Sequence, residues 1–351
     1  MNFLDGALFP ENQEKLVITA APYGPEWLPS DFLEDIAVSM DEQVQKAVDC
    51  YNAGATVLHV HVREADGKGS KRLSQFNELL ARLRVAVPDM VLQVGGSISF
   101  APESDGQAAK WLSDDTQHML AELTPKPDQV TVTVNTVQMN IVEQMETADY
   151  AGTSLAEPAT YAAYREMVVP AGPGWVEEHV RRLTAQGIQS AFQFYNINSF
   201  ETVERMIRRG VYQGPLVMNW VAIGGGMDAP NTYNLANFLR ATPDGAVLTL
   251  ESSMRNVLPV NMMAIAMGLH VRCGIEDNLW TQDRKAKMGT AKQVEQLVRI
   301  SREFGRPVAT GKEAREILQI GTFYNTIEET LEKNGFAPNR KPVRALMQAA
   351  E

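Results

Sequence analysis

Short runs rich in valine, leucine and isoleucine alternate along the chain with longer stretches whose apolar residues recur at helical spacing. Eight short runs have the length and composition of buried strands, and they cover residues 16–20, 56–62, 90–94, 129–134, 189–195, 215–221, 246–251 and 270–273. Eight longer stretches predict helices at residues 41–53, 74–87, 113–123, 174–186, 200–209, 231–241, 259–267 and 287–304. The alternation predicts a parallel sheet covered by helices.

Eight strand–helix repeats in 351 residues fit an α/β fold of the closed (β/α)8 type, the TIM barrel. An open doubly wound sheet is the alternative, but residues 19–24 after the first strand lack the glycine pattern of a dinucleotide site. No composition shift or flexible linker marks a second domain, so we expect one domain over residues 1–351 with its core at about 15–305. Residues 100–110 and 145–173 are predicted as loop insertions, and residues 306–351 as a C-terminal extension with helices at 312–320 and 326–333.

The composition narrows the class of partner and the compartment. Lys and Arg number 32 against 43 Asp and Glu, and the resulting net charge of −11 makes nucleic acid a poor partner. Two cysteines, Cys50 and Cys273, cannot build a disulfide framework. The sequence shows no signal-peptide pattern and no apolar run long enough for a membrane span. We therefore expect a cytoplasmic protein that does not enter a membrane.

Two histidines give the clearest chemical signal. His59 and His61 lie two residues apart on the second predicted strand, so their side chains share one face, while Leu58 and Val60 share the other. Two imidazoles that face the barrel mouth are satisfied either by hydrogen bonds in the core or by a divalent metal such as zinc. The spacing leaves both possibilities open.

The end of the last strand supplies acidic partners. Arg272, Glu276 and Asp277 lie where a TIM barrel carries its functional groups, at the carboxyl end of a strand and in the following loop. One carboxylate could bind a cation while the other, oriented by the arginine, acts as a base. A solvated loop with a salt bridge is the alternative. Because the last strand closes beside the first, Glu276 could reach the histidine pair.

Other strand ends offer weaker candidates for substrate binding. Gly95, Gly96 and Ser97 follow the third strand, where exposed backbone N–H groups could hold a carboxylate, and Thr136 follows the fourth strand with a hydroxyl. Glu26 follows the first strand and could face a cationic group of the substrate. A simple turn or an exposed side chain is the alternative at each position.

Two further segments could meet an acyl-CoA. Gly225 and Gly226, after the sixth strand, could let pantetheine or phosphate approach the backbone, although a glycine-rich turn is as plausible. Arg255, after the seventh strand, could bind a phosphate or a carboxylate.

Taken together, these residues resemble the β-keto acid cleavage enzyme family over roughly residues 15–320. The specific matches are His-Val-His-Val-Arg-Glu at 59–64 and Arg-Cys-Gly-Ile-Glu-Asp-Asn at 272–278. Further similarity lies at residues 16–21, 66–67, 95–96, 225–227, 268–271 and 305–310.

The resemblance implies a (β/α)8 barrel with one zinc ion held by His59, His61 and Glu276. It implies that Asp277 and Arg272 form the base dyad. Thr136 and the turn at residues 95–97 match the region that binds the carboxylate and the ketone of the substrate, and Glu26 matches a carboxylate that meets a substrate amine. The family also implies a homo-oligomer, commonly a homotetramer.

The implied reaction is a Claisen exchange in which a β-keto acid and acetyl-CoA give acetoacetate and a new acyl-CoA. A metal-dependent hydrolase or aldolase on the same barrel is the alternative, and a metal-binding or acyl-CoA-binding protein without activity is another. Gln193 and Asn196 stand where the family usually carries acidic residues, so the substituent of the keto acid stays open.

Overall fold

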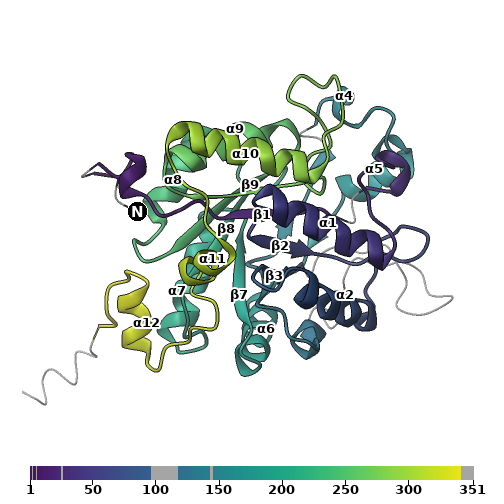
Figure 1. The fold of residues 1–351 in the computed structure, drawn as a ribbon. Helices are drawn as coiled ribbons and strands as arrows, with labels where there is room; N and C mark the ends of the chain where they lie inside the picture. Colours follow the sequence, from purple (N-terminus) through teal and green to yellow (C-terminus); the bar gives the residue numbers. More distant parts are fainter. Residues whose placement is uncertain (2, 5, 25–26, 96–117, 143–144, 341–351) are drawn as a thin grey trace, which may run out of the picture.

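The protein, here in a computed structural model, forms a closed barrel of eight parallel strands (Figure 1). The structure describes residues 1, 3–4, 6–24, 27–95, 118–142 and 145–340. In chain order the barrel strands are β1 (Ile18–Ala20), β2 (Val57–Val60), β3 (Val91–Val94), β4 (Gln129–Thr133), β7 (Gln189–Phe194), β8 (Val217–Ala222), β9 (Val247–Ser252) and β10 (His270–Cys273). β10 pairs with β1 and closes the barrel, which confirms the predicted (β/α)8 fold and each of its eight strands.

Helices surround the barrel, and each helix of the outer ring overlaps a predicted one (Figure 1). The outer ring contains α1 (Met40–Ala53), α2 (Leu73–Ala86), α6 (Pro173–Ala185), α7 (Asn198–Arg208), α8 (Thr232–Ala241), α9 (Val257–Ala266) and α10 (Thr290–Phe304). Sequence signals mark their ends: the Ser39 side chain caps the start of α1, and Gly54 ends it in a left-handed conformation. Short 3-10 helices lie at η1 (Pro10–Asn12), η2 (Pro29–Asp31), η3 (Met119–Glu122), η5 (Ser154–Ala156) and η6 (Met254–Asn256). The predicted helix 113–123 is described only at its end, where η3 lies.

The predicted insertion at residues 145–173 has short elements of its own. It contains α4 (Thr147–Tyr150), η5, α5 (Pro158–Arg165) and β6 (Val168–Val169), which pairs antiparallel with β5 (Val137–Gln138). Leu155, Tyr164 and Met167 of this segment pack with Trp27 and Met254 in a second apolar cluster, separate from the main core. The insertion therefore adds apolar side chains beside the loops that follow the strands. The predicted insertion at 100–110 lies outside the described residues.

The C-terminal segment closes the opposite end of the barrel. Its predicted helices are present as α11 (Gly311–Ile317) and α12 (Ile327–Lys333). Ala314 and Leu318 pack against Val17 and Val57, which lie at the starts of their strands, and α11 crosses in front of the strands in Figure 1. Access to the barrel interior is therefore directed to the carboxyl ends of the strands.

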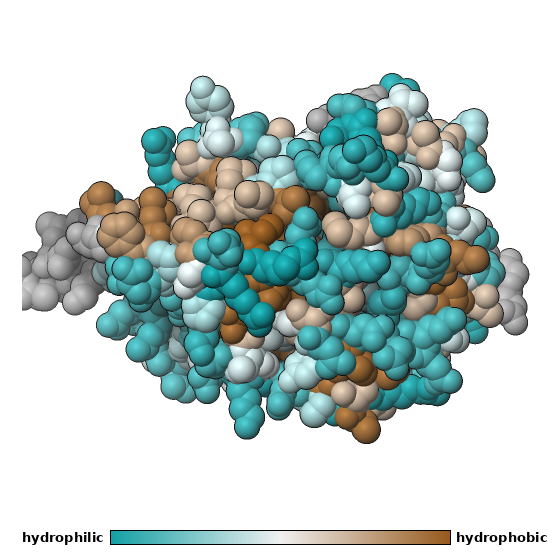
Figure 2. Space-filling view, turned by 45° about the horizontal axis from the view of Figure 1, so that its top comes forward, coloured by the Kyte–Doolittle hydropathy of each residue, from teal (hydrophilic) through white to brown (hydrophobic). Residues whose placement is uncertain are grey.

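The face shown in Figure 2 is mostly hydrophilic, with apolar side chains gathered over the N-terminal segment and α9. Leu8 and Phe9 of the N-terminal segment and Met262 of α9 are at least half exposed. Contiguous exposed apolar surface is typical of interaction sites. No helix in the described part of the chain combines the length and apolar character needed to cross a membrane.

Candidate active site

His59 and His61 lie at the end of β2 and point into the barrel mouth, as their shared face predicts. Leu58 and Val60 alternate with them and belong to the main hydrophobic core. Nδ1 of His59 bonds Oε1 of Gln93 on the neighbouring strand at 2.8 Å. This contact turns Nε2 of His59 toward Nε2 of His61, 3.0 Å away. The two nitrogens therefore converge on one place.

Glu276 brings a carboxylate to the same place. Its Oε1 lies 3.5 Å from Nε2 of His59 and 3.5 Å from Nε2 of His61, and the three candidate ligand atoms lie within 4.8 Å of one another. Among the described residues, nothing bonds the buried Oε2 of Glu276. Burial lowers the pKa of His59 to about 4, aided by the Arg272 charge, which leaves the imidazole neutral and able to bind a metal. Two imidazoles and one carboxylate form a typical donor set for a zinc ion that keeps an open coordination position.

Gly95 follows β3 directly beside these donors. A Cβ atom at this position would lie 2.4 Å from Nε2 of His61 and 2.6 Å from Nε2 of His59. Any larger residue would displace the imidazoles from their present positions. The space beside the donor atoms therefore exists because residue 95 has no side chain.

Arg272 connects this site to two further carboxylates. Its Nη2 donates to Oε1 of Glu276 at 2.6 Å and to Oδ1 of Asp277 at 2.8 Å, and its Nε donates to Oδ2 of Asp277 at 2.9 Å. Its Nε also lies 3.6 Å from Oε1 of Glu251 on β9. The fork of the guanidinium thus fixes Asp277 through two parallel bonds.

The charges in this cluster do not balance within the protein. One buried guanidinium faces three carboxylates, so the fully ionised cluster has an excess of two negative charges. Burial raises the pKa of Asp277 to about 6 and that of Glu251 to about 7, and the Arg272 charge offsets this only in part. Burial also acts on Glu276, but the Arg272 charge, together with the contact from His59, outweighs it and holds the pKa of Glu276 well below its ordinary value. A divalent cation beside Glu276 would supply the missing positive charge.

Glu251 is a site residue that the sequence analysis does not identify. It comes at the end of a predicted strand in which Leu248 and Leu250 face the core. The same alternation that places His59 and His61 would have placed Glu251 in the barrel mouth. Its Oε2 accepts from Nδ2 of Asn219 at 3.1 Å, so it is held from β8 as well as by Arg272.

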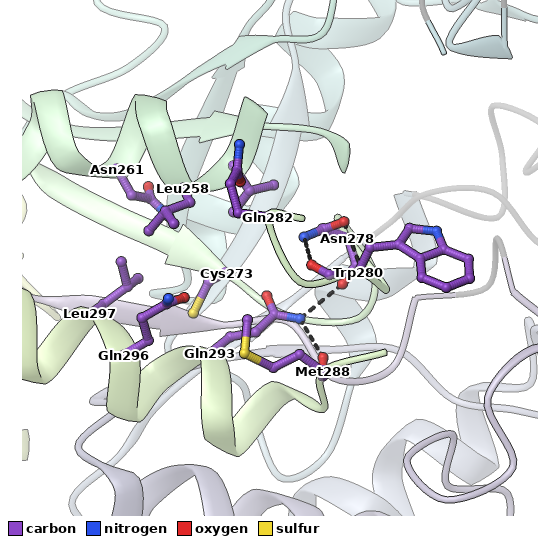
Figure 3. Close-up of a pocket in the computed structure, with 11 residues that line it drawn as sticks. Leu258, Asn261, Cys273, Asn278, Trp280, Gln282, Met288, Gln293, Gln296 and Leu297 are labelled. Carbon is purple, nitrogen blue, oxygen red and sulfur yellow. Dashed lines mark hydrogen bonds between the residues drawn. The ribbon is translucent and has the colours of Figure 1, made fainter. Parts of the chain in front are cut away.

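The loop after β10 is held from both sides. On the barrel side, N of Glu276 donates to the carbonyl oxygen of Ala21 at 3.1 Å, and N of Met254 donates to that of Asp277 at 2.7 Å. Behind the loop lies a small pocket between α9 and α10 (Figure 3). There Nε2 of Gln293 donates to the carbonyl oxygen of Asn278 at 2.8 Å.

A second amide fixes the strand itself. Nδ2 of Asn261 on α9 donates to the carbonyl oxygen of Arg272 at 2.7 Å. Side chains of the outer helices thereby fix the backbone of both ends of the segment that carries Arg272, Glu276 and Asp277.

A pocket of about 510 Å³, partly open to solvent, lies over this cluster. Its polar floor is formed by Glu251, Arg272, Glu276 and Asp277. Its walls are mainly apolar, and they are lined by Trp27, Met139, Ile141, Leu155, Tyr164, Ile223 and Met254, with Ser253 beside them. Such an arrangement can hold an apolar group above a charged reaction centre.

Two other predicted substrate-binding residues, Thr136 and Arg255, have partners outside this cluster. The hydroxyl of Thr136 accepts from N of Ala171 at 3.0 Å. Nε of Arg255 donates to Oδ1 of Asp149 in α4 at 3.2 Å. Glu26, Gly96 and Ser97 lie outside the described residues.

Gly225 and Gly226 adopt positive φ angles of 65° and 115°. A Cβ atom on Gly225 would lie 2.0 Å from the carbonyl oxygen of Asn140, and one on Gly226 would lie 2.6 Å from that of Gln138. These glycines allow the protein's own backbone to approach closely, and the contact with pantetheine stays a prediction.

Gln193 and Asn196, which stand where the family usually carries acidic residues, lie in different surroundings. Oε1 of Gln193 lies 3.4 Å from Nδ2 of Asn219, which also bonds Glu251, so Gln193 belongs to the outer edge of the charged cluster. Oδ1 of Asn196 accepts from N of Asn198 at the start of α7. Asn196 therefore stabilises a helix start.

Known proteins resemble the chain over most of its length. One relative is the 3-keto-5-aminohexanoate cleavage enzyme of Acetoanaerobium sticklandii, 27% identical over 88% of this chain and 99% of that protein. Another is the 3,5-dioxohexanoate:acetyl-CoA acetone transferase of Paraburkholderia graminis, 24% identical over 90% of this chain and 98% of that protein.

Among solved structures, the binary complex of ObcA with oxaloacetate matches with a TM-score of 0.59 and 13% identity, over 82% of this chain and 68% of that one. At this identity the similarity supports the fold alone. The model of the beta-keto acid cleavage enzyme family matches residues 15–320. The protein therefore belongs to the beta-keto acid cleavage enzyme family, which confirms the membership and the enzyme class expected from its His-x-His and Glu-Asp motifs.

Proposed function

We propose that the protein is a zinc-dependent acyltransferase that converts a β-keto acid and acetyl-CoA into acetoacetate and a new acyl-CoA. The observation that carries the proposal is the convergence of His59, His61 and Glu276 beside the paired Asp277 and Arg272. The names of the relatives, a keto acid cleavage enzyme and an acetyl-CoA-dependent transferase, support the same reaction class.

The three donors fit zinc because His59 is neutral, Oε2 of Glu276 is buried without a partner in the described structure, and Gly95 leaves space beside them. When bound, zinc would supply a Lewis acid able to polarise a carbonyl oxygen of the substrate.

Asp277 is the proposed general base, and Arg272 is its positioning partner. The two parallel bonds from Arg272 fix the plane of the Asp277 carboxylate at the floor of the pocket. A carboxylate whose pKa is raised by burial is a stronger base than one in water. In this role it takes the proton from the carbon between the ketone and the carboxylate of the keto acid.

The remaining steps balance without a covalent bond to the protein. The carbanion attacks the thioester carbon of acetyl-CoA and expels the CoA thiolate. The thiolate then adds to the original ketone carbon, and the bond between that carbon and the former carbanion breaks. Acetoacetate leaves after its carbanion regains the proton from Asp277, and the new acyl-CoA is the second product.

A metal-dependent hydrolase is the main alternative. Within the described part of the chain, the group formed by His59, His61 and Glu276 is the one cluster of three or more side chains that could hold a metal ion. A two-metal hydrolase would need a second set of ligands nearby. The Asp277–Arg272 pair next to a single candidate site therefore favours the exchange reaction.

The walls of the pocket favour a keto acid with an uncharged, largely apolar substituent. Trp27, Leu155, Tyr164 and Met254 surround the space above the charged floor. A charged substituent would lose its hydration against these side chains without gaining an opposite charge from them. Gly96, Ser97, Thr136 and Arg255 stay predicted contacts of the substrate, and Gly225 and Gly226 predicted contacts of acetyl-CoA. Glu26 also stays a predicted contact, and a cationic substituent that it would bind is the alternative substrate class.

We also propose that the protein is a homo-oligomer, a tetramer by its resemblance to the family. The exposed apolar side chains over the N-terminal segment and α9 form a surface suited to a contact between subunits. A cytoplasmic location stays a prediction.

The first test uses acetyl-CoA labelled in its acetyl group and a panel of β-keto acids with apolar, cationic and anionic substituents. We expect label in acetoacetate and the highest kcat/KM with an apolar substituent. Mass spectrometry of acetoacetate and of the acyl-CoA product measures both. Release of labelled acetate without acetoacetate would support a hydrolase instead, and a preference for a charged substituent would contradict the proposed substrate class.

The second test is Asp277→Asn, which keeps the shape of the side chain and removes its basicity. We expect kcat to fall by about a thousandfold while bound zinc is retained, because Asp277 is not among the proposed ligands. Steady-state kinetics and metal analysis measure the two effects. Asp283→Asn, in the exposed part of the same loop region, is the matched control and should retain activity. Near-normal turnover of Asp277→Asn would exclude Asp277 as the base.

The third test is Gly95→Ala, whose added methyl group would collide with both imidazoles. We expect the variant to retain no zinc when one equivalent of zinc per chain is added. Its thermal unfolding midpoint should stay close to that of the wild type. Metal analysis after gel filtration measures the zinc content. Gly174→Ala is the control, because a Cβ at Gly174 meets nothing within 4 Å. Full zinc occupancy in Gly95→Ala would place the metal site elsewhere.

A further inference from the structure

Three buried glutamines form a continuous row of hydrogen bonds inside the barrel. Oε1 of Gln93 bonds Nδ1 of His59 at 2.8 Å, and Nε2 of Gln93 donates to Oε1 of Gln129 at 2.9 Å. Nε2 of Gln129 donates to Oε1 of Gln189 at 2.6 Å. The three side chains are at most 4% exposed, so each bond lies in the protein interior. The row therefore begins at a proposed metal ligand.

The row follows the register of the barrel. His59 pairs with Gln93, Gln93 with Gln129, and Gln129 with Gln189 as Cα partners on β2, β3, β4 and β7. His59 lies near the carboxyl end of its strand, whereas Gln189 is the first residue of its strand. Because barrel strands are tilted and staggered, one row of partners runs from one end of the barrel toward the other.

The row ends on the backbone of the C-terminal segment. Nε2 of Gln189 donates to the carbonyl oxygen of Leu318 at 3.0 Å and to that of Gln319 at 3.1 Å. Leu318 packs in the cluster that closes the amino ends of the strands. The metal ligand and the segment after α11 are thus connected through three side chains.

The two carbonyl groups set the direction of every bond in the row. A carbonyl oxygen can only accept, so the amide nitrogen of Gln189 must face Leu318 and Gln319. Oε1 of Gln189 then accepts from Gln129, and Oε1 of Gln129 accepts from Gln93. Oε1 of Gln93 is left to accept a hydrogen bond from Nδ1–H of His59. Turning the amides round would place Oε1 of Gln189 against two carbonyl oxygens in the buried interior, which is strongly unfavourable.

We propose that Gln93, Gln129 and Gln189 are positioning residues that hold His59 in the tautomer protonated at Nδ1. That tautomer leaves the lone pair of Nε2 on the side of His61 and Glu276. A histidine whose second nitrogen is fixed in this way binds metal more tightly, since no tautomer has to be exchanged on binding. The backbone at Leu318 and Gln319 is then part of the metal site although it lies at the other end of the barrel. The effect on zinc affinity rests on the function proposed above, whereas the tautomer does not.

The test removes the far end of the row with Gln189→Met, which keeps the size of the side chain and removes the donor and the acceptor. Gln43→Met is the matched control, because Gln43 is a 1% exposed glutamine on α1 whose Nε2 donates to the carbonyl oxygen of Val38 at 2.8 Å. The first readout is the tautomer of His59, measured by 15N NMR of the metal-free protein, in which the two ring nitrogens give separate signals. The second readout is zinc affinity, measured by competition with a chelator.

We expect one Nδ1–H tautomer of His59 in the wild type and in Gln43→Met, and a mixture of tautomers in Gln189→Met. The Kd of zinc should rise by about tenfold in Gln189→Met, and by more in Gln93→Met, which removes the direct partner of His59. Gln189→Glu should restore the wild-type tautomer, because a buried carboxylic acid that stays protonated can donate to a carbonyl and accept from Gln129.

A folded Gln189→Met protein with one Nδ1–H tautomer and unchanged zinc affinity would overturn the proposal. If Gln189→Met does not fold, Gln129→Met interrupts the same row and is judged by the same two readouts. Wild-type protein that binds no zinc but shows the single tautomer would contradict the proposed metal site and support the row of amides, so the two proposals can fail separately.

Discussion

The guanidinium of Arg272 holds three buried carboxylates in one cluster, and the arrangement of the whole site depends on it. It bonds Asp277 twice and Glu276 once and lies 3.6 Å from Glu251. A single positive charge cannot balance three negative charges at such low exposure, so the cluster is complete only with protons or with a further cation. A bound metal would complete the cluster, because the neutral imidazole of His59 beside Glu276 offers a lone pair and adds no charge.

Hydrogen bonds inside the barrel connect the charged cluster to the opposite end of the molecule. His59 belongs to the charged cluster at one end, and the row of glutamines connects it to backbone carbonyl groups at the other. Each glutamine in the row accepts one hydrogen bond through Oε1 and donates through Nε2. All the bonds therefore run in one direction, from His59 toward the C-terminal segment. Buried polar networks of this kind are stable only when every member is satisfied, which restricts the residues allowed at these positions.

The sequence predicts the strands and the convergence of His59, His61 and Glu276 well because both follow local rules. The alternation of side chains places His59 and His61 on one face, and the strand-end rule places Glu276 near them. The sequence does not identify Glu251 as a site residue, because it is a single carboxylate in an apolar strand and belongs to no recognisable motif. The glutamine row depends on the register between paired strands, which a local sequence pattern does not predict. Thr136 bonds Ala171, and this contact depends on how the insertion folds back.

The side chains proposed for the chemistry and those proposed for substrate selection come from different parts of the chain. The charged floor of the pocket is formed by residues at the ends of β9 and β10, whose positions are fixed by the barrel itself. Leu155 and Tyr164 of the walls come from the insertion, which packs in a separate apolar cluster. Changes in the insertion can therefore alter the fit of a substituent without moving Arg272 or Asp277. The apolar walls also limit the access of water to the charged floor, which strengthens the electrostatic interaction between Arg272 and Asp277, the proposed base.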